Sequence, residues 1–247
     1  MMSSETIEDL SLKELVRIFR LLDSLEADKD KPRSVLIGGW AVFSYNAYHK
    51  SVDVDILTPN KVRDSLIKDL KSHHGYELRP LEEGENPHLY KPFGNQKVIV
   101  DFINPNIPYN FPGKSDALVH SFIYGRLRKA ALGSITVPVP ERTALLVTKL
   151  KAAWDRGVKL DTYRSRDRAF DEGKIVKDQS DILALIDRER GGVDIDLDFL
   201  STMLDKHPFL RTVLVASGKS KSAAELYGKP PDEAAGTVQT LLMLLSK

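Results

Sequence analysis

The chain has 247 residues, of which 42% are hydrophobic, and its net charge is +1. That length and composition allow one large domain or two modest ones with buried cores. The small net charge excludes a basic field over the whole protein, although local patches are compatible with it. The absence of cysteine excludes disulfides, zinc–thiolate sites and thiol catalysis.

No segment of the sequence is typical of export or of membrane insertion. Residues 1–16 are acidic and amphipathic and lack the apolar core of a signal peptide. No apolar run approaches the roughly 20 residues that a membrane helix needs. We therefore expect a cytoplasmic protein with no membrane partner.

Strand and helix patterns alternate through the first half of the chain. Apolar residues at helical spacing predict an opening helix over 6–25, and Gly75 ends a second helix that begins at Pro59-Asn60. The short helix expected between two strands covers 39–48. The expected strands cover 35–37, 52–57 and 97–103, and the expected turn and loop segments cover Glu82–Pro87 and 104–114.

The pattern changes near Pro140, where a short extended piece at 135–140 ends. Beyond it the sequence predicts helices over 141–156, 178–190, 196–205 and 233–246, joined by polar connections at 157–177 and 217–232. Arg164, Arg166 and Arg168 form a basic run that suits a solvated loop or an RNA contact. We expect an α/β protein with domains at 1–139 and 140–247, the first built on a small mixed sheet and the second a helical bundle.

Asp53 and Asp55 stand two residues apart in the predicted strand, between Val52, Val54 and Ile56. Alternate residues of a strand point to one face, so the two carboxylates would converge. Like charges held this close favour a cation between them, and Mg²⁺ commonly takes one or two carboxylates plus substrate phosphates. The alternative is a strand end with two solvated acids.

Two further features strengthen the metal interpretation. Gly38-Gly39 lies between a strand and a helix, where glycine lets backbone N–H groups approach a phosphate, although an ordinary tight turn has the same sequence. Asp101 lies in the apolar strand KVIVDFI, where a carboxylate is costly unless it is paired, bound to metal or at a solvated strand end. Three carboxylates from two strands could hold two metal ions.

These motifs resemble the nucleotidyltransferase superfamily of the polymerase-β type, whose signature is Gly-[Gly/Ser], a helix, Asp-x-Asp and a third Asp on a later strand. The Gly-Gly-Trp-Ala-Val form is similar to the branch of antibiotic nucleotidyltransferases and AbiEii-like toxins. Those relatives carry Arg-x-Thr-x-Asp-x-Asp. Here His49 stands at the Arg position and Ser51 at the Thr position.

The resemblance extends into the helical part. AbiEii-like proteins carry Lys-Leu-x-Ala-x-x-x-Arg and later Lys/Arg-Asp-x-x-Asp, which match Lys149 to Arg156 and Lys177 to Asp181. Lys149 and Arg156 share one helix face, as do Asp178 and Asp181. Geometry alone leaves two interpretations open, a structural ion-pair network or a triphosphate clamp.

The resemblance implies an Mg²⁺-dependent transfer of a nucleoside monophosphate from a nucleoside triphosphate. It implies catalytic roles for Asp53, Asp55, Asp101, Lys149 and Asp178, with the first three as metal ligands. Nucleotide contacts would come from Gly38, Gly39, Ser51, Lys149 and Arg156. The acceptor would be an RNA such as tRNA, a protein or a small hydroxylated molecule, and a toxin would have an antitoxin partner. The alternative is a catalytically silent protein that binds a nucleotide or a partner.

Overall fold

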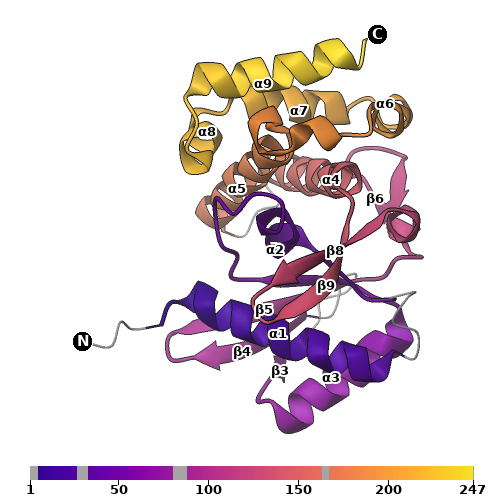
Figure 1. The fold of residues 1–247 in the computed structure, drawn as a ribbon, viewed down its shortest axis with the longest axis vertical. Coiled ribbons are helices and arrows are strands. Elements are labelled where there is room, and N and C mark those ends of the chain that lie inside the picture. Colours follow the sequence, from indigo (N-terminus) through magenta and orange to yellow (C-terminus); the bar gives the residue numbers. More distant parts are fainter. Residues whose placement is uncertain (1–4, 27–32, 80–87, 163–166, 247) are drawn as a thin grey trace. The chain divides into compact units, whose positions relative to one another are not determined.

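The computed structural model describes residues 5–26, 33–79, 88–162 and 167–246, which divide into two compact units (Figure 1). Unit 1 comprises Met1–Ser44, Lys50–Ile107 and Val119–Pro140, and unit 2 comprises Tyr45–His49, Pro108–Leu118 and Glu141–Lys247. The predicted turn at Glu82–Pro87, as well as Arg164 and Arg166 of the basic run, lie outside the described residues.

A mixed five-stranded sheet forms the centre of unit 1. Its order is β1-β2-β5-β4-β3, and only the β2–β5 pair is parallel among its four pairings. The strands are β1 (Val35–Ile37), β2 (Val54–Leu57), β3 (Glu77–Leu78), β4 (His88–Phe93) and β5 (Gln96–Ile103). The small mixed sheet that the sequence predicts is therefore confirmed.

Strand β2 is shorter than the sequence predicts, and Asp53 precedes it instead of lying in it. Strand β1 ends at Ile37, whose register partner is Asp55, because the chain then turns into α2. Residues 52 and 53 thus have no ladder partner in β1, and they form a bend. The prediction that Asp53 lies in this strand is wrong.

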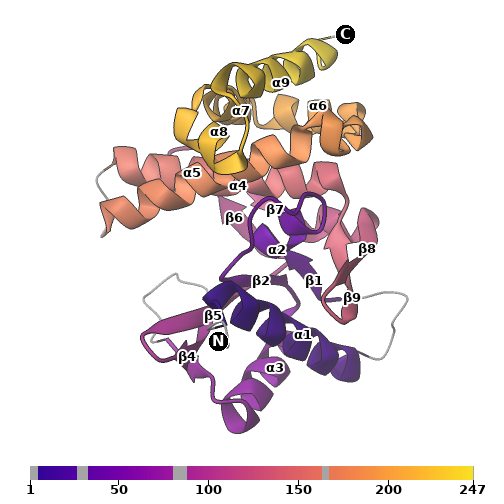
Figure 2. The same ribbon diagram turned by 60° about the vertical axis from the view of Figure 1, so that its left-hand side comes forward.

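Helix α1 (Ile7–Leu25) buries one apolar stripe in unit 1. Thr6 caps it by accepting a 3.2 Å hydrogen bond from the N–H of Asp9. Its buried residues recur at the three- and four-residue spacing of one helix face, and they include Leu15, Ile18, Phe19 and Leu22. The helix packs against α3 (Asn60–His73) and β5 (Figure 2).

Helix α2 (Gly38–Phe43) is a short element whose centre is fully buried. Trp40 has no exposed surface, and its indole N–H donates a 2.9 Å hydrogen bond to Ser11 of α1. The sequence predicts a helix to residue 48, but the helix ends at Phe43. Residues 45–49 instead form turns whose side chains bond to helices of unit 2.

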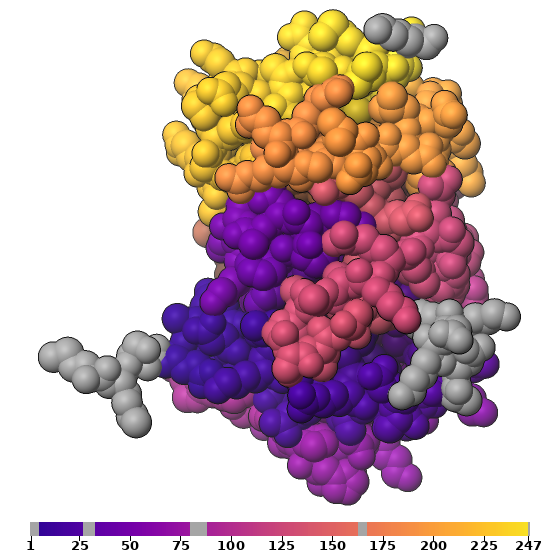
Figure 3. All heavy atoms as spheres, in the orientation of Figure 1, coloured from indigo at the N-terminus to yellow at the C-terminus, as the bar shows by residue number. Residues whose placement is uncertain are grey.

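The remaining strands of unit 1 form a two-stranded hairpin, β8 (Leu127–Leu132) and β9 (Ile135–Pro140), preceded by the 3-10 helix η1 (His120–Gly125). Strand β9 packs against β1 and α1, and Figure 3 shows the hairpin and α1 side by side on one face of unit 1.

Unit 2 is mainly helical, as the sequence predicts for the C-terminal half. Its elements are α4 (Arg142–Asp161), α5 (Arg168–Ile186), η2 (Arg188–Arg190), η3 (Gly192–Asp194), α6 (Leu197–Lys206), α7 (Leu210–Lys219), α8 (Lys221–Tyr227) and α9 (Pro231–Leu244). Helix α5 packs against α4, α7 and α8, and α7 packs against α9. A β6–β7 pair (Pro108–Asn110 with Ala117–Val119) precedes these helices in the sequence.

The polar connections predicted at 157–177 and 217–232 are largely helical. Helix α4 runs on to Asp161, α5 begins at Arg168, and α7 and α8 run as far as Tyr227. Helices α6 and α9 match the predictions within two residues. Across the described residues, no helix is long and apolar enough to cross a membrane.

Candidate functional site

Asp55 and Asp101 are register partners on the two parallel strands β2 and β5. Adjacent strands lie about 4.8 Å apart, and paired residues of a parallel ladder point to the same face. The fold thus brings the second Asp of the Asp-x-Asp motif beside the third predicted carboxylate. Both are partly accessible, and the side chain of Asp101 is 44% exposed.

Gly38 lies directly against the carboxylate of Asp55. Its φ angle is +70°, and a Cβ at this position would stand 1.8 Å from Oδ2 of Asp55. Only glycine combines this backbone conformation with so close an approach. The Gly-Gly motif and the Asp-x-Asp motif are therefore in contact, while Gly39 is buried in the first turn of α2.

The segment that leads into β2 is held in place by polar contacts. The side chain of Lys50 reaches Asp9 of α1, with Nζ 2.6 Å from Oδ1. Ser51 is 4% exposed, and its hydroxyl donates a 3.2 Å hydrogen bond to the carbonyl of Asp53. His49, at the position of the usual Arg, is half-buried, and its ring lies 5.9 Å from the ring of Tyr48.

A histidine stands beside the third carboxylate. His88 on β4 is the register partner of Asp101, and its Nδ1 lies 3.7 Å from Oδ1 of Asp101. On its other side, Nε2 of His88 lies 3.3 Å from the guanidinium of Arg79. Sequence reasoning missed His88 because nothing in the chain indicates which residue of β4 pairs with Asp101.

The pair of carboxylates Asp55 and Asp101 suits the binding of one divalent metal ion. Among residues 5–26, 33–79, 88–162 and 167–246, no group of three or more His, Asp or Glu side chains is arranged to hold a metal ion. Mg²⁺ needs only one or two carboxylates when phosphate oxygens and waters complete its octahedron. The chemistry of Asp55 and Asp101 fits that requirement.

The predicted residues of unit 2 form a buried ion-pair cluster between α4 and α5. Nζ of Lys149 lies 2.6 Å from Oδ2 of Asp181 and 3.2 Å from Oδ1 of Asp178. Arg156, two turns along α4, pairs with the other oxygen of Asp178. Lys149, Asp178 and Asp181 are each at most 6% exposed, whereas the side chain of Arg156 is 33% exposed.

Asp181 is the most heavily engaged carboxylate of this cluster. Nζ of Lys177 lies 3.1 Å from its Oδ2, and the hydroxyl of Tyr48 donates a 2.6 Å hydrogen bond to its Oδ1. Burial acts to raise the pKa of Asp181, but Lys149, Lys177 and these hydrogen bonds lower it to about 2. Burial and the charge of Asp181 raise the pKa of Tyr48 well above its usual range.

The sequence-predicted residues thus fall into two sets. Unit 1 carries the glycines, Ser51 and the three aspartates 53, 55 and 101, of which the fold brings Gly38, Asp55 and Asp101 together. Unit 2 carries Lys149, Arg156 and Asp178, which contact one another. Sequence reasoning missed Tyr48, whose only signal is its place just before the Asp-x-Asp strand.

The sequence matches no protein-family model and no curated protein. Among solved structures, the chain is similar to the crystal structure of an antigenic nucleotidyltransferase-like protein from Paracoccidioides brasiliensis. The identity is 17%, the TM-score is 0.41, and the match covers 82% of this chain and 91% of that chain.

Proposed function

We propose that the chain is a nucleotidyltransferase that transfers a nucleoside monophosphate from a nucleoside triphosphate to an acceptor. The observation that carries the proposal is the triad of Gly38, Asp55 and Asp101. Two carboxylates stand in register on parallel strands, and a backbone turn without a side chain lies against one of them. In such an arrangement, a backbone turn without a side chain would let a metal-bound phosphate group approach the acids closely.

Asp55 and Asp101 would hold the Mg²⁺ ion, with Asp53 as a further predicted ligand on the segment just before β2. When bound, Mg²⁺ would neutralise the triphosphate charge that the carboxylates would otherwise repel. Nδ1 of His88 lies 3.7 Å from Oδ1 of Asp101, so a ring nitrogen stands beside these carboxylates.

In the proposed reaction, an acceptor oxygen attacks the α-phosphorus of the triphosphate. A new oxygen–phosphorus bond forms, the bond from the α-phosphorus to the bridging oxygen breaks, and pyrophosphate leaves. Asp101 takes the acceptor's proton, because its side chain is partly exposed and lies on the face it shares with Asp55. Backbone N–H groups at Gly38 and Gly39 would contact phosphate, and Ser51 would support the segment that carries Asp53.

Of the two predicted nucleotide-binding cations of unit 2, Lys149 and Arg156, only one is accessible enough for a phosphate contact. Lys149 is buried and already paired with Asp178 and Asp181, which favours the structural interpretation of this cluster. Arg156 is the more accessible of the two cations and is the better candidate for a phosphate contact. Asp178 would orient both cations.

The test is transfer of label from α-³²P nucleoside triphosphates with Mg²⁺. The acceptors offered would be bulk RNA, the purified protein and polyhydroxylated small molecules. We expect transfer by the wild-type chain and by Asp64→Asn, a matched change at an exposed acid of α3. We expect Asp55→Asn and Asp101→Asn to lose activity by about 100-fold or more. Equal transfer by wild type and Asp55→Asn would contradict the assignment.

The acceptor defines the biological role. If the acceptor is an RNA or a protein that cells require, the chain would act as a toxin of the AbiE-like kind. Expression of the wild type would then arrest growth, expression of Asp55→Asn would not, and an antitoxin would be encoded beside it. Growth of both strains at the same rate would argue for a small hydroxylated acceptor.

A catalytically silent nucleotide-binding or partner-binding protein is the second candidate. The burial of Lys149 within ion pairs favours it, because a lysine held in this way is not available to a triphosphate. Thermal-shift titration with each nucleoside triphosphate, with and without Mg²⁺, separates the two candidates. A nucleotide at 100 times its dissociation constant stabilises a protein by about 2.7 kcal/mol. Stabilisation without any transfer would favour the silent protein.

A further inference from the structure

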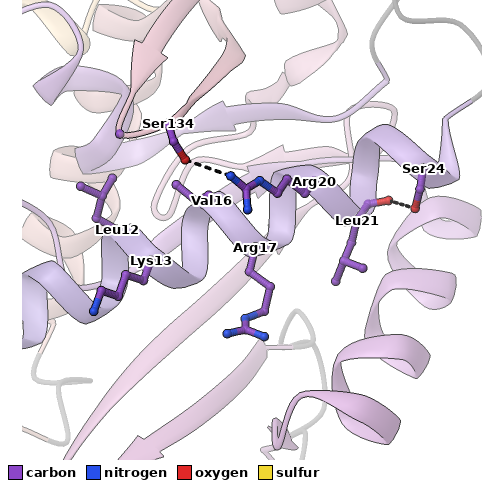
Figure 4. A pocket seen from close by; sticks show the side chains of 9 residues that line it. Leu12, Lys13, Val16, Arg17, Arg20, Leu21, Ser24 and Ser134 are labelled. Atoms are coloured by element: carbon purple, nitrogen blue, oxygen red, sulfur yellow. Dashed lines mark hydrogen bonds between the residues drawn. The ribbon is translucent and has the colours of Figure 1, made fainter.

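An open groove of about 770 Å³ lies between α1 and the turn of the β8–β9 hairpin, within unit 1 (Figure 4). It is separate from the residues discussed above, since its lining comes from α1 and from Gly133 and Ser134. Such a volume is in the range of binding sites for ligands and for anchoring side chains of partners.

The turn approaches the helix closely and is joined to it by a hydrogen bond. Gly133 has a φ angle of +57°, and a Cβ there would stand 3.3 Å from Cγ2 of Val16. The guanidinium of Arg20 donates a 3.0 Å hydrogen bond to the hydroxyl of Ser134, as Figure 4 shows. The groove is therefore a formed feature of this unit.

The lining is positively charged. Lys13, Arg17 and Arg20 follow one another at four- and three-residue spacing and so occupy one face of α1. Among the residues that the structure describes, no Asp or Glu lines the groove. Where cations outnumber the carboxylates that pair with them, an anionic ligand is favoured by charge complementarity.

Lys13, Arg17, Arg20 and Lys91 outnumber the two carboxylates, Glu5 and Glu14, that pair with cations of this region. Lys13 pairs with Glu5, and Arg17 with Glu14, a buried carboxylate at 3.2 Å. Glu14 also accepts contacts from Tyr76 and Lys91, at 2.7 Å and 2.9 Å, so its charge is shared. Within the described parts of the chain, no carboxylate pairs with Arg20.

Half-buried apolar side chains lie between the cations. Leu12, Val16 and Leu21 contribute to the lining, and Figure 4 shows them along the same length of α1 as the charged residues. The groove thus alternates apolar surface with positive charge over about two and a half turns of helix. A ligand that matches it carries both carboxylates and apolar groups.

We propose that this groove binds an acidic peptide segment of a partner protein, with its apolar side chains on Leu12, Val16 and Leu21 and its carboxylates at Lys13 and Arg20. The side chains of Lys13 and Arg17 are 65% and 43% exposed, so the groove does not enclose a small molecule, whose site buries most of its surface. The described lining of the groove has no aromatic side chain on which a nucleic-acid base could stack.

The test begins with a phage library of random 12-residue peptides, selected on the full chain. The best peptide is then synthesised with fluorescein, and its affinity is measured by fluorescence polarisation. We expect selected sequences to be rich in Asp or Glu with Leu, Ile or Phe. We expect the double variant Lys13→Glu/Arg20→Glu to weaken binding by about tenfold or more. The matched control is Lys61→Glu/Lys68→Glu, two exposed lysines of α3 with the same change in charge.

The outcomes separate the proposal from its alternatives. Peptides without acidic enrichment, no enrichment over a bare surface, or equal weakening by the α3 control would each overturn it. A 12-residue oligouridine bound more tightly than the peptide, and lost in Lys13→Glu/Arg20→Glu, would overturn it in favour of RNA. If the double Glu variant melts early, Lys13→Gln/Arg20→Gln replaces it, with an expected loss of about threefold or more.

Discussion

Replacing Gly38 with alanine would place a methyl group 1.8 Å from Oδ2 of Asp55. Cβ atoms do not approach other atoms within 3.0 Å, so the carboxylate would have to move by about 1.2 Å. The φ angle of +70° adds a second cost, since an alanine in the left-handed region is destabilised by about 1–2 kcal/mol. The crowding adds about 1–3 kcal/mol, as in other overpacked sites.

Gly75 offers a matched control for the backbone part of this effect. Its φ angle is also +70°, but a Cβ at Gly75 would meet nothing within 4 Å. Gly75→Ala should therefore cost about 1–2 kcal/mol, whereas Gly38→Ala should cost about 2–5 kcal/mol. The difference between the two variants isolates the contact with Asp55.

Urea unfolding followed by the fluorescence of Trp40 measures this difference. Trp40 is fully buried two residues after Gly38, and in a Trp154→Phe background it is the chain's only tryptophan. Under the proposed function, Gly38→Ala would also lower nucleotidyl transfer. If Gly38→Ala is no less stable than Gly75→Ala, the close packing of Gly38 on Asp55 is refuted.

The other predictions concern the buried cluster around Asp181. Asp181→Asn should destabilise unit 2 by about 3 kcal/mol in urea unfolding followed by circular dichroism, because Lys149 and Lys177 lose a buried counter-charge. Tyr48→Phe should cost about 2 kcal/mol by the same assay, since it removes a charge-assisted hydrogen bond. The pKa of Asp181 is lowered from 3.8 to about 2, so its ionisation contributes about 2 kcal/mol to the stability of the folded state above pH 4. This contribution is lost as the pH falls towards 2. Acid titration of Asp181→Asn should lack that loss.

One control variant and one double variant test the predictions for Asp181 and Tyr48. Asp205→Asn removes an exposed acid of α6, 68% exposed, and should change stability by less than about 0.5 kcal/mol. The costs of Tyr48→Phe and Asp181→Asn should fall short of additivity in the double variant, because both remove the same hydrogen bond. Full additivity would mean that Tyr48 and Asp181 do not interact.

The strands of unit 1 illustrate what the sequence could and could not predict. Strand β5 was predictable because its apolar residues are dense and Asp101 stands alone among them. The pairing of β2 with β5 was not, since a sequence carries no direct sign of register. The placement of Asp53 outside β2 depends on where the neighbouring strand β1 ends, and the residues around Asp53 carry no sign of that.

The missed helices of unit 2 have local explanations. Half of the residues in the first half of α5 are charged, and its buried residue is Asp171, so it lacks an apolar stripe. Its N-cap is Asp167, which accepts a hydrogen bond from the N–H of Phe170 at 3.0 Å. Helix α7 uses Ser217 and Gly218, which are poor helix formers, at buried positions. A Cβ on Gly218 would lie 2.9 Å from Val238 of α9, so close packing explains the glycine.

The burial of Lys149 also lay beyond sequence reasoning. Its spacing from Arg156 predicts a shared helix face, but lysines are mostly exposed. Only the tertiary structure adds Lys149 and Tyr48 to Asp181 and leaves Lys149 at 6% exposure. For this reason the ion-pair interpretation and the clamp interpretation could not be separated beforehand.

The membership of Tyr45–His49 in unit 2 has a consequence for dissection of the chain. Asn46 donates hydrogen bonds to the carbonyl of Ala184 and the hydroxyl of Tyr227, at 3.3 Å and 2.8 Å. It precedes Glu141, where the continuous part of unit 2 begins, by almost 100 residues. A fragment that starts at Glu141 would lack these bonds. During synthesis on the ribosome, this five-residue loop would emerge long before the helices that bind it, so unit 2 can mature only after most of the chain has been made.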